Sequence, residues 1–222
     1  MHKTLNFVTN RVIERSKASR ENYLQIMQTM ARKGPNRAHL DCGNSAHASA
    51  TMGPDRKLFV DTKCSNIGII SAYNDILSAH QPFKKFPTII RDTARTHGCT
   101  AQFAGGVPAM CDGVTQGQPG MELSLFSREI IALSAGISLS HNTFDGVVYL
   151  GICDKIVPGL MMAAATFGHL PGIFLPSGPM PSGLPNEEKS RIRKRFANGE
   201  IDRTTLMKAE MASYHSPGTC TF

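Results

Sequence analysis

Short apolar runs alternate along the chain with longer amphipathic stretches. Short runs bounded by Gly, Pro or polar residues predict buried strands, whereas longer stretches with apolar residues at every third or fourth position predict helices. Strands are predicted at residues 67–72, 100–104, 147–152 and 173–176, and helices between them at residues 87–97, 121–136 and 160–167. This alternation predicts an α/β fold in which a mostly parallel sheet carries helices on both faces.

The helix predicted at residues 121–136 gathers large apolar side chains on one face. The spacing of three and four residues between them is that of an amphipathic helix. The residues on this face are Leu123, Phe126, Ile130, Leu133 and Ile137.

The two ends of the chain add helical segments to this α/β core. Residues 9–33 predict one helix or a broken pair of helices, followed by a polar, irregular segment over residues 36–63. Beyond residue 180 the chain is charged and helical, with Asn186 and Asp202 as expected N-caps. We therefore expect residues 1–63 to form a helical N-terminal segment that packs on the core, and residues 64–222 to form the α/β domain.

Composition and charge exclude several classes of function. The hydrophobic content of 41% and charged content of 18% are those of an ordinary globular protein. No apolar run could span a bilayer, and the first twenty residues lack the apolar centre of a secretory signal, so we expect a cytoplasmic protein without a membrane partner. The net charge of +7 is spread out with no basic stripe interleaved with aromatic residues, so a small anionic substrate explains it as well as nucleic acid does, and we expect no nucleic-acid partner.

Six cysteines are present at irregular spacings, at positions 42, 64, 99, 111, 153 and 220. They are too sparse for a disulfide scaffold in a chain of this length, so we interpret them as free thiols or metal ligands. His39 and His47 lie near Cys42, but their spacing fits no zinc pattern.

Residues whose side chains could bind a metal or take part in catalysis follow three of the predicted strands. Asn74, Asp75 and His80 come after the first strand, Cys111-Asp112 after the second, and Cys153-Asp154-Lys155 after the third. Parallel strands end at one edge of the sheet, and in open α/β sheets that edge binds ligands. The sequence therefore predicts a functional site at this edge.

The stretch from Gly151 to Gly159 is the centre of this prediction. It reads as the end of a buried strand, a tight loop and the start of a helix, with Pro158 suited to the first helical position. The loop presents a thiol, a carboxylate and an amine. The alternative interpretation of this triplet is a buried structural thiol beside a salt bridge at the end of a loop.

Several linked stretches resemble the dihydroxy-acid and sugar-acid dehydratase family. Cys153-Asp154-Lys155 is followed by Pro158-Gly159, and the Asp112-Gly113 loop is followed by Ser127-Arg128-Glu129. Gly218-Thr219-Cys220 at the end of the chain matches a further family motif. The resemblance runs from residue 9 to residue 222, and residues 74–82 are similar to the branch that dehydrates 6-phosphogluconate.

The resemblance implies an enzyme with an iron-sulfur cluster, most often 4Fe-4S, and a divalent metal ion. It places Cys153 and Cys220 at the cluster, and Asp112, Asp154 and a carboxylated Lys155 at Mg²⁺ or Mn²⁺, with Asp154 and Lys155 as catalytic residues. Some relatives carry a third cluster cysteine where this chain has Ala79. Cys111 is a candidate for that role by its position alone, and a buried structural thiol is the alternative.

The implied reaction is a hydro-lyase step of the Entner-Doudoroff pathway of gluconate utilisation, which removes water from 6-phospho-D-gluconate to give 2-dehydro-3-deoxy-6-phospho-D-gluconate. The family also implies a homodimer and a C-terminal β-rich domain that supplies a further metal carboxylate and the base. We expect the present chain, without that domain, to be inactive by itself. The alternatives are a dehydratase of another sugar acid or of branched-chain 2,3-dihydroxy acids, and a metal-free binding or assembly domain.

Overall fold

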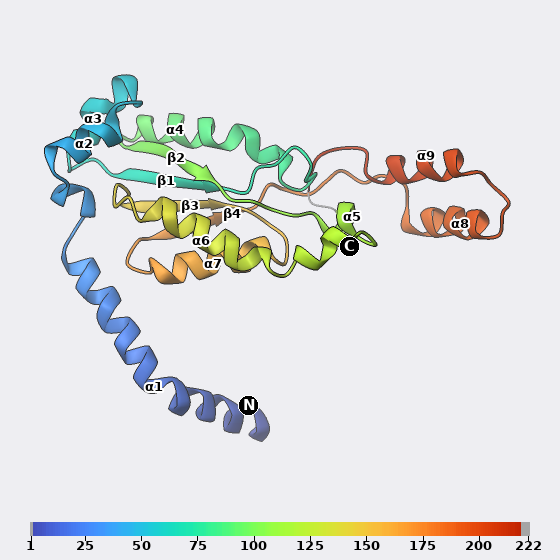
Figure 1. Cartoon of the computed structure of the whole chain (residues 1–222), viewed down its shortest axis with the longest axis horizontal. Helices are drawn as coiled ribbons and strands as arrows, with labels where there is room; N and C mark the ends of the chain where they lie inside the picture. Colours follow the sequence, from blue (N-terminus) through green and yellow to red (C-terminus); the bar gives the residue numbers. More distant parts are fainter. Residues whose placement is uncertain (1, 219–222) are drawn as a thin grey trace.

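A computed structural model describes residues 2–218 and contains a four-stranded parallel sheet (Figure 1). Its strands are β1 (Asn66–Ser71), β2 (Thr100–Gly106), β3 (Gly146–Leu150) and β4 (Gly172–Leu175), in the order β2-β1-β3-β4. All three strand pairs are parallel, so the carboxyl ends of the strands share one edge. The predicted α/β class is confirmed.

Helices cover both faces of the sheet (Figure 1). Helix α4 (Phe86–Thr96) lies on one face, and α6 (Ser127–Leu139) and α7 (Ile156–Thr166) lie side by side on the other. Side chains alternate along a strand, so successive residues of β1 enter different cores. Ile69 belongs to the cluster on the α4 side and Ile70 to the cluster on the side of α6 and α7.

The contact between α6 and α7 depends on a glycine. A Cβ atom at Gly159 of α7 would lie 2.8 Å from the Arg128 carbonyl oxygen and 2.9 Å from the Ile131 Cβ atom, both on α6. We expect Gly159→Ala to lower the free energy of unfolding by about 1–3 kcal/mol, because backbone and a buried Cβ atom must move. Urea unfolding measures the loss. Gly120→Ala is the matched control, since a Cβ atom there meets nothing within 4 Å; equal losses in both variants would contradict the prediction.

The predicted helix at residues 121–136 begins later and faces differently than expected. A 3₁₀ turn, η4 (Pro119–Leu123), comes first, and α6 starts at Ser127. Its buried side chains are Ile131, Ala135 and Leu139. The five apolar side chains of the predicted face are each more than half exposed, from 51% at Ile130 to 71% at Phe126. The apolar face therefore lies on the surface of this chain.

Before the sheet the chain consists of helices and short connecting turns. Helix α1 (Lys3–Arg32) is one continuous helix that diverges from the body of the molecule (Figure 1), and the hydroxyl of Tyr23 donates to the carbonyl of Ala165 in α7 at 2.8 Å. Neither α1 nor any other helix within residues 2–218 is both long and apolar enough to cross a membrane. The segment predicted to be irregular contains η1 (Asn36–His39), α2 (Cys42–Ser49), η2 (Gly53–Asp55) and α3 (Arg56–Val60).

A buried arginine connects this segment to the sheet. The guanidinium of Arg37 donates to the carbonyls of Phe59 and Cys64 and pairs with Asp145 at 3.1 Å. Asp145 in turn accepts from the backbone N–H of Asn66 at the start of β1, at 2.8 Å. These bonds give the short helices a fixed attachment that their own sequence pattern does not reveal.

After the sheet the chain forms a helical hairpin that projects from the body (Figure 1). It consists of α8 (Asn186–Ala197) and α9 (Arg203–Ser213), joined by a bidentate ion pair between Arg193 and Glu210. The expected N-cap at Asp202 is confirmed, because its carboxylate accepts from the N–H of Thr205 at 2.9 Å. The expected cap at Asn186 is wrong by one residue, since Asn186 is the first helical residue and Pro185 precedes it.

Candidate active site

A cavity of about 360 Å³ lies at the carboxyl edge of the sheet. Three loops supply its walls, each following a different strand. The lining residues are 77–80 after β1, 110–113 after β2, and 153–155 after β3. The parallel topology thus gathers loops that lie far apart in the sequence, as predicted.

The loop after β3 holds Cys153 in an unusual conformation. Its φ angle is +80°, in the left-handed region that residues other than glycine rarely adopt. Strained residues of this kind cluster at functional sites. Cys153 is exposed, and α7 begins three residues later at Ile156, so Pro158 is the third helical residue instead of the first. A proline there is still tolerated, because the first-turn N–H groups lack helical partners.

Lys155 is the buried cation of the cavity, only 4% exposed. Its ammonium group pairs with the carboxylate of Asp112 from the neighbouring loop and with that of Asp154 at 2.9 Å. Burial acts to lower the pKa of Lys155, but the hydrogen bonds to Asp112 and Asp154 outweigh it and the pKa lies above its usual value. Lys155 is therefore an ammonium ion at neutral pH.

Asp112 is held as a carboxylate by the same contact. Burial acts to raise the pKa of Asp112, but hydrogen bonds from Lys155 and from the hydroxyl of Ser124, at 2.7 Å, outweigh it and the pKa lies below its usual value. The short helix α5 (Asp112–Thr115) begins at this residue. The site therefore contains one buried positive charge between two carboxylates.

The loop after β1 also holds two segments from later in the chain. The backbone carbonyl of Ala79 accepts from the hydroxyl of Ser177, in the loop after β4. The carbonyl of Ser78 accepts from the N–H of Gly218 at 2.9 Å. The next turn, η3 (Gln81–Lys85), leads into α4. Hydrogen bonds therefore connect this loop to the loop after β4 and to the segment that ends at Gly218.

His80 was expected at this edge of the sheet as part of the motif of residues 74–82, but no role was assigned to it. It is fully buried, and its Nε2 atom lies 3.1 Å from the carbonyl oxygen and 3.2 Å from the nitrogen of Ile152, the residue before Cys153. Its Nδ1 atom is buried without a hydrogen-bond partner among the residues that the structure describes. His80 thus holds the backbone that presents Cys153.

The buried ring of His80 predicts a loss of stability in acid. Burial lowers the pKa of His80 to about 4, although the Ile152 backbone acts to raise it, while the unfolded chain titrates near 6.5. Between these pH values the unfolded state binds more protons than the folded state. The contribution of His80 to the free energy of unfolding is therefore complete above pH 6.5 and is lost as the pH falls towards 4. Between pH 7.5 and 4.5 we expect His80 to account for about 2–3 kcal/mol of lost unfolding free energy.

Urea unfolding of the His80→Gln variant at both pH values measures this contribution. The variant should lose that much less stability than the wild type on acidification, because glutamine does not titrate. His141→Gln replaces an exposed histidine and should retain the wild-type pH dependence. An unchanged acid response in His80→Gln would show that the ring is not a source of it.

The structure brings together five of the six predicted site residues. Cys111, Asp112, Cys153, Asp154 and Lys155 all line the cavity. Cys220 lies outside the described residues. Within residues 2–218, no group of three or more His, Cys, Asp or Glu side chains is arranged to hold a metal ion.

Comparison with known proteins gives the family. The model of the dihydroxy-acid/6-phosphogluconate dehydratase N-terminal region matches residues 65–222, which is more than half of the chain. The chain belongs to the dihydroxy-acid/6-phosphogluconate dehydratase family. The matched region contains the whole sheet and every residue of the cavity.

Curated members of this family include close relatives of the chain. Phosphogluconate dehydratase of Rhizobium meliloti (strain 1021) is 59% identical over 216 residues, which are 97% of this chain and 36% of that protein. The phosphogluconate dehydratase of Escherichia coli (strain K12) is 56% identical over 223 residues, 100% of this chain and 37% of that protein. Dihydroxy-acid dehydratase of Thermodesulfovibrio yellowstonii is 33% identical over 69% of this chain. The chain spans little more than a third of the length of these two phosphogluconate dehydratases.

Proposed function

We propose that this chain forms the N-terminal part of a dehydratase that converts 6-phospho-D-gluconate to 2-dehydro-3-deoxy-6-phospho-D-gluconate and water. The identity of 54–59% to relatives named phosphogluconate dehydratase, against 33% to a dihydroxy-acid dehydratase, supports this substrate. The observation that carries the proposal is the cavity in which Cys153, Asp112 and Lys155 meet from separate loops. Such an enzyme is a hydro-lyase of carbohydrate metabolism.

The thiols of the site fit an iron-sulfur cluster, for which we propose the 4Fe-4S type. Cys153 is exposed at the cavity, and Cys111 lines the same cavity in a half-buried position. Thiolates are the ligands that cluster iron requires. We propose Cys153 and Cys220 as ligands and Cys111 as the third. Gly218, two residues before Cys220 in the sequence, is bonded to Ser78 of the cavity wall, which supports including Cys220.

The oxygen donors of the site fit a divalent cation only after a change at Lys155. Asp112 and Asp154 present carboxylates, which suit Mg²⁺ or Mn²⁺, but the ammonium of Lys155 lies between them and repels a cation. Carboxylation of Lys155 would replace that charge with an anionic oxygen donor. We therefore propose Asp112, Asp154 and carboxylated Lys155 as the ligands of the divalent ion.

The residues of this chain bind and orient the substrate, and a group outside this chain removes its proton. Lys155 cannot act as a general base in its unmodified form, because it stays protonated at neutral pH. Asp112 has a lowered pKa and is a weak base. When bound, the cluster and the divalent ion would supply Lewis acidity at the leaving hydroxyl and at the substrate carboxylate. We propose that the base comes from outside this chain, that the whole enzyme is a cytoplasmic homodimer, and that this chain alone is inactive.

Turnover by the full-length gene product tests the substrate. The anaerobically purified enzyme should form a 2-keto-3-deoxy acid from 6-phosphogluconate much faster than from gluconate or from 2,3-dihydroxyisovalerate, as measured by 2-keto acid production. Equal or faster turnover of gluconate would indicate that the substrate is another sugar acid. Equal or faster turnover of 2,3-dihydroxyisovalerate would indicate the reaction of branched-chain amino-acid biosynthesis. No turnover of any of the three acids would overturn the dehydratase proposal.

A further inference from the structure

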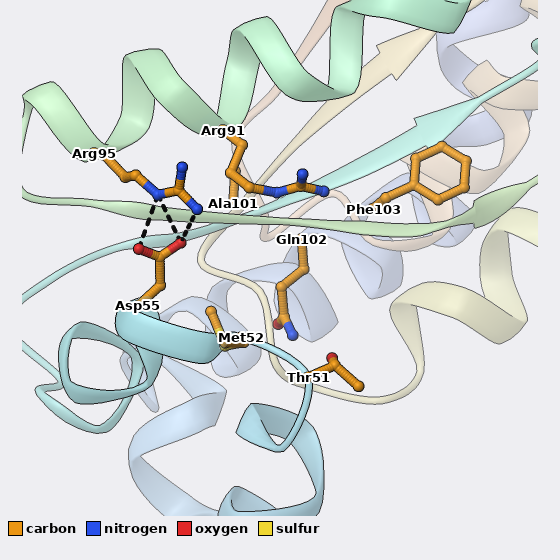
Figure 2. Close-up of a pocket in the computed structure, with 8 residues that line it drawn as sticks. All are labelled: Thr51, Met52, Asp55, Arg91, Arg95, Ala101, Gln102 and Phe103. Atoms are coloured by element: carbon orange, nitrogen blue, oxygen red, sulfur yellow. Dashed lines mark hydrogen bonds and ion pairs between the residues drawn. The ribbon is translucent and has the colours of Figure 1, made fainter.

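A second cavity, of about 310 Å³, lies at the edge strand of the sheet. Helix α4, strand β2 and the segment around η2 form its walls (Figure 2). Arg91 and Arg95 reach into it from α4, and Phe103 lies at one end. None of its lining residues is shared with the candidate active site, and its strand residues come from the amino-terminal half of β2. It is therefore a separate site.

One of the two arginines is fully neutralised. The guanidinium of Arg95 forms hydrogen bonds of 2.8 and 2.9 Å to the two carboxylate oxygens of Asp55 (Figure 2) and pairs with Asp92 at 2.9 Å. The hydrogen bond to Asp55, partly offset by burial, raises the pKa of Arg95. Asp55 is itself buried, so its charge is used within this pair.

The amide of Gln102 is also occupied. Its nitrogen donates to the carbonyl of Ala48 at 2.9 Å, and its oxygen accepts from the side chain of Asn66 at 2.9 Å. These bonds fix the amide at the floor of the cavity. The amide of Gln102 therefore has little remaining capacity to form hydrogen bonds with a ligand or with Arg91.

Arg91 is the unsatisfied group of this cavity. Its side chain is half-buried and extends over β2 towards Phe103 (Figure 2). No hydrogen bond, ion pair or ring contact joins it to any of the residues that the structure describes. Because Asp55 offsets Arg95, the residues that line the cavity carry one net positive charge, and the five N–H donors of Arg91 meet no acceptor within residues 2–218.

We propose that this cavity binds a small organic anion through a carboxylate or phosphate group held by Arg91. A guanidinium matches the geometry of both groups with paired N–H···O bonds. The hydroxyl of Thr51 and the apolar surfaces of Met52 and Phe103 complete the cavity around the remainder of the ligand. Its volume lies at the low end for ligand pockets, which favours a metabolite over a larger cofactor.

Calorimetric titration of the chain tests this site with inorganic phosphate, gluconate and the uncharged control glucose. Phosphate and gluconate should bind and compete with each other, glucose should not, and added salt should weaken the binding. Arg91→Gln should weaken the binding of both anions by about tenfold or more, because the charged donor is lost. Arg20→Gln, which removes an exposed arginine of α1, should leave it unchanged.

Two further measurements distinguish this cavity from the candidate active site. The Cys153→Ser variant should bind the anions as the wild type does, and amide NMR shifts on titration should concentrate at residues 101–103. A thermal melt confirms that Arg91→Gln is folded, and Arg91→Lys should retain part of the affinity. Absence of binding to the wild type up to about 10 mM, wild-type affinity in Arg91→Gln, or shifts confined to residues 110–113 and 153–155 would each overturn the proposal.

Discussion

Replacing Asp112 with Ala is expected to lower the free energy of unfolding of this chain by about 2–3 kcal/mol. The substitution removes the carboxylate that pairs with Lys155, whose side chain is 5% exposed, and leaves only Asp154 at 2.9 Å. Asp154 is 82% exposed, so water weakens its pairing with the ammonium group. A buried charge with reduced compensation is among the most destabilising changes in a protein core.

A double substitution separates this cause from a general loss of packing. In Asp112→Ala with Lys155→Met no buried charge remains, so the double variant should regain most of the stability that Asp112→Ala loses. Urea unfolding of the wild type, both single variants and the double variant gives the coupling energy. Additive losses in the double variant would show that the two groups do not depend on each other.

The same pair predicts how stability changes at extreme pH. The raised pKa of Lys155 means that its contribution is present below pH 10.5 and is lost as the pH rises through the folded-state value. The lowered pKa of Asp112 means that its contribution is present above pH 3.8 and is lost as the pH falls through the folded-state value. Between these limits the pair adds stability that does not depend on pH.

Replacing Arg37 with Met is expected to cost more, about 3–5 kcal/mol, because it breaks a buried ion pair. Asp145 would keep its hydrogen bond from Asn66 but lose its cation, and the carbonyls of Phe59 and Cys64 would lose their donor. Arg37 also lies over the ring of Phe59, with its Cζ atom 5.0 Å from the ring centroid. Since these groups connect the segment before the sheet to β1, the loss should loosen residues 36–63 first.

Hydrogen exchange and urea unfolding together test this prediction. Arg37→Met should speed amide exchange in α2 and α3 more than in β1 and β3, in addition to lowering global stability. Arg11→Met replaces an exposed arginine of α1 and should change neither. Uniform exchange throughout the Arg37→Met chain, or a loss below about 1 kcal/mol, would show that the pair is a minor contributor.

The sheet could be predicted because its signal is local. The strands are short apolar runs, and parallel topology follows from their alternation with helices. The short helices of residues 36–63 could not be predicted, because they are held by Arg37, whose partners lie up to 108 residues away. The outward orientation of Leu133 and Ile137 was also not predictable, since periodicity identifies an apolar face but not what covers it.

The candidate site could be predicted to the level of loops and residue types. Asp112 and Lys155 were expected at one edge, and the structure adds that Lys155 is buried and lies between two carboxylates. The role of His80 depends on a contact with Ile152, 72 residues away, which no local pattern contains. The left-handed backbone conformation of Cys153 could not be predicted either, because residues other than glycine rarely adopt it.

The most direct test of the central claim is the iron content of the full-length gene product after anaerobic reconstitution with iron and sulfide. The wild type and Cys99→Ser, which changes a half-buried thiol at the opposite end of β2, should each hold about four iron atoms per chain and absorb in the visible range. Cys153→Ser and Cys220→Ser should lose most of this iron while remaining folded. Wild-type iron content in Cys153→Ser, or no iron in the wild type, would contradict the account.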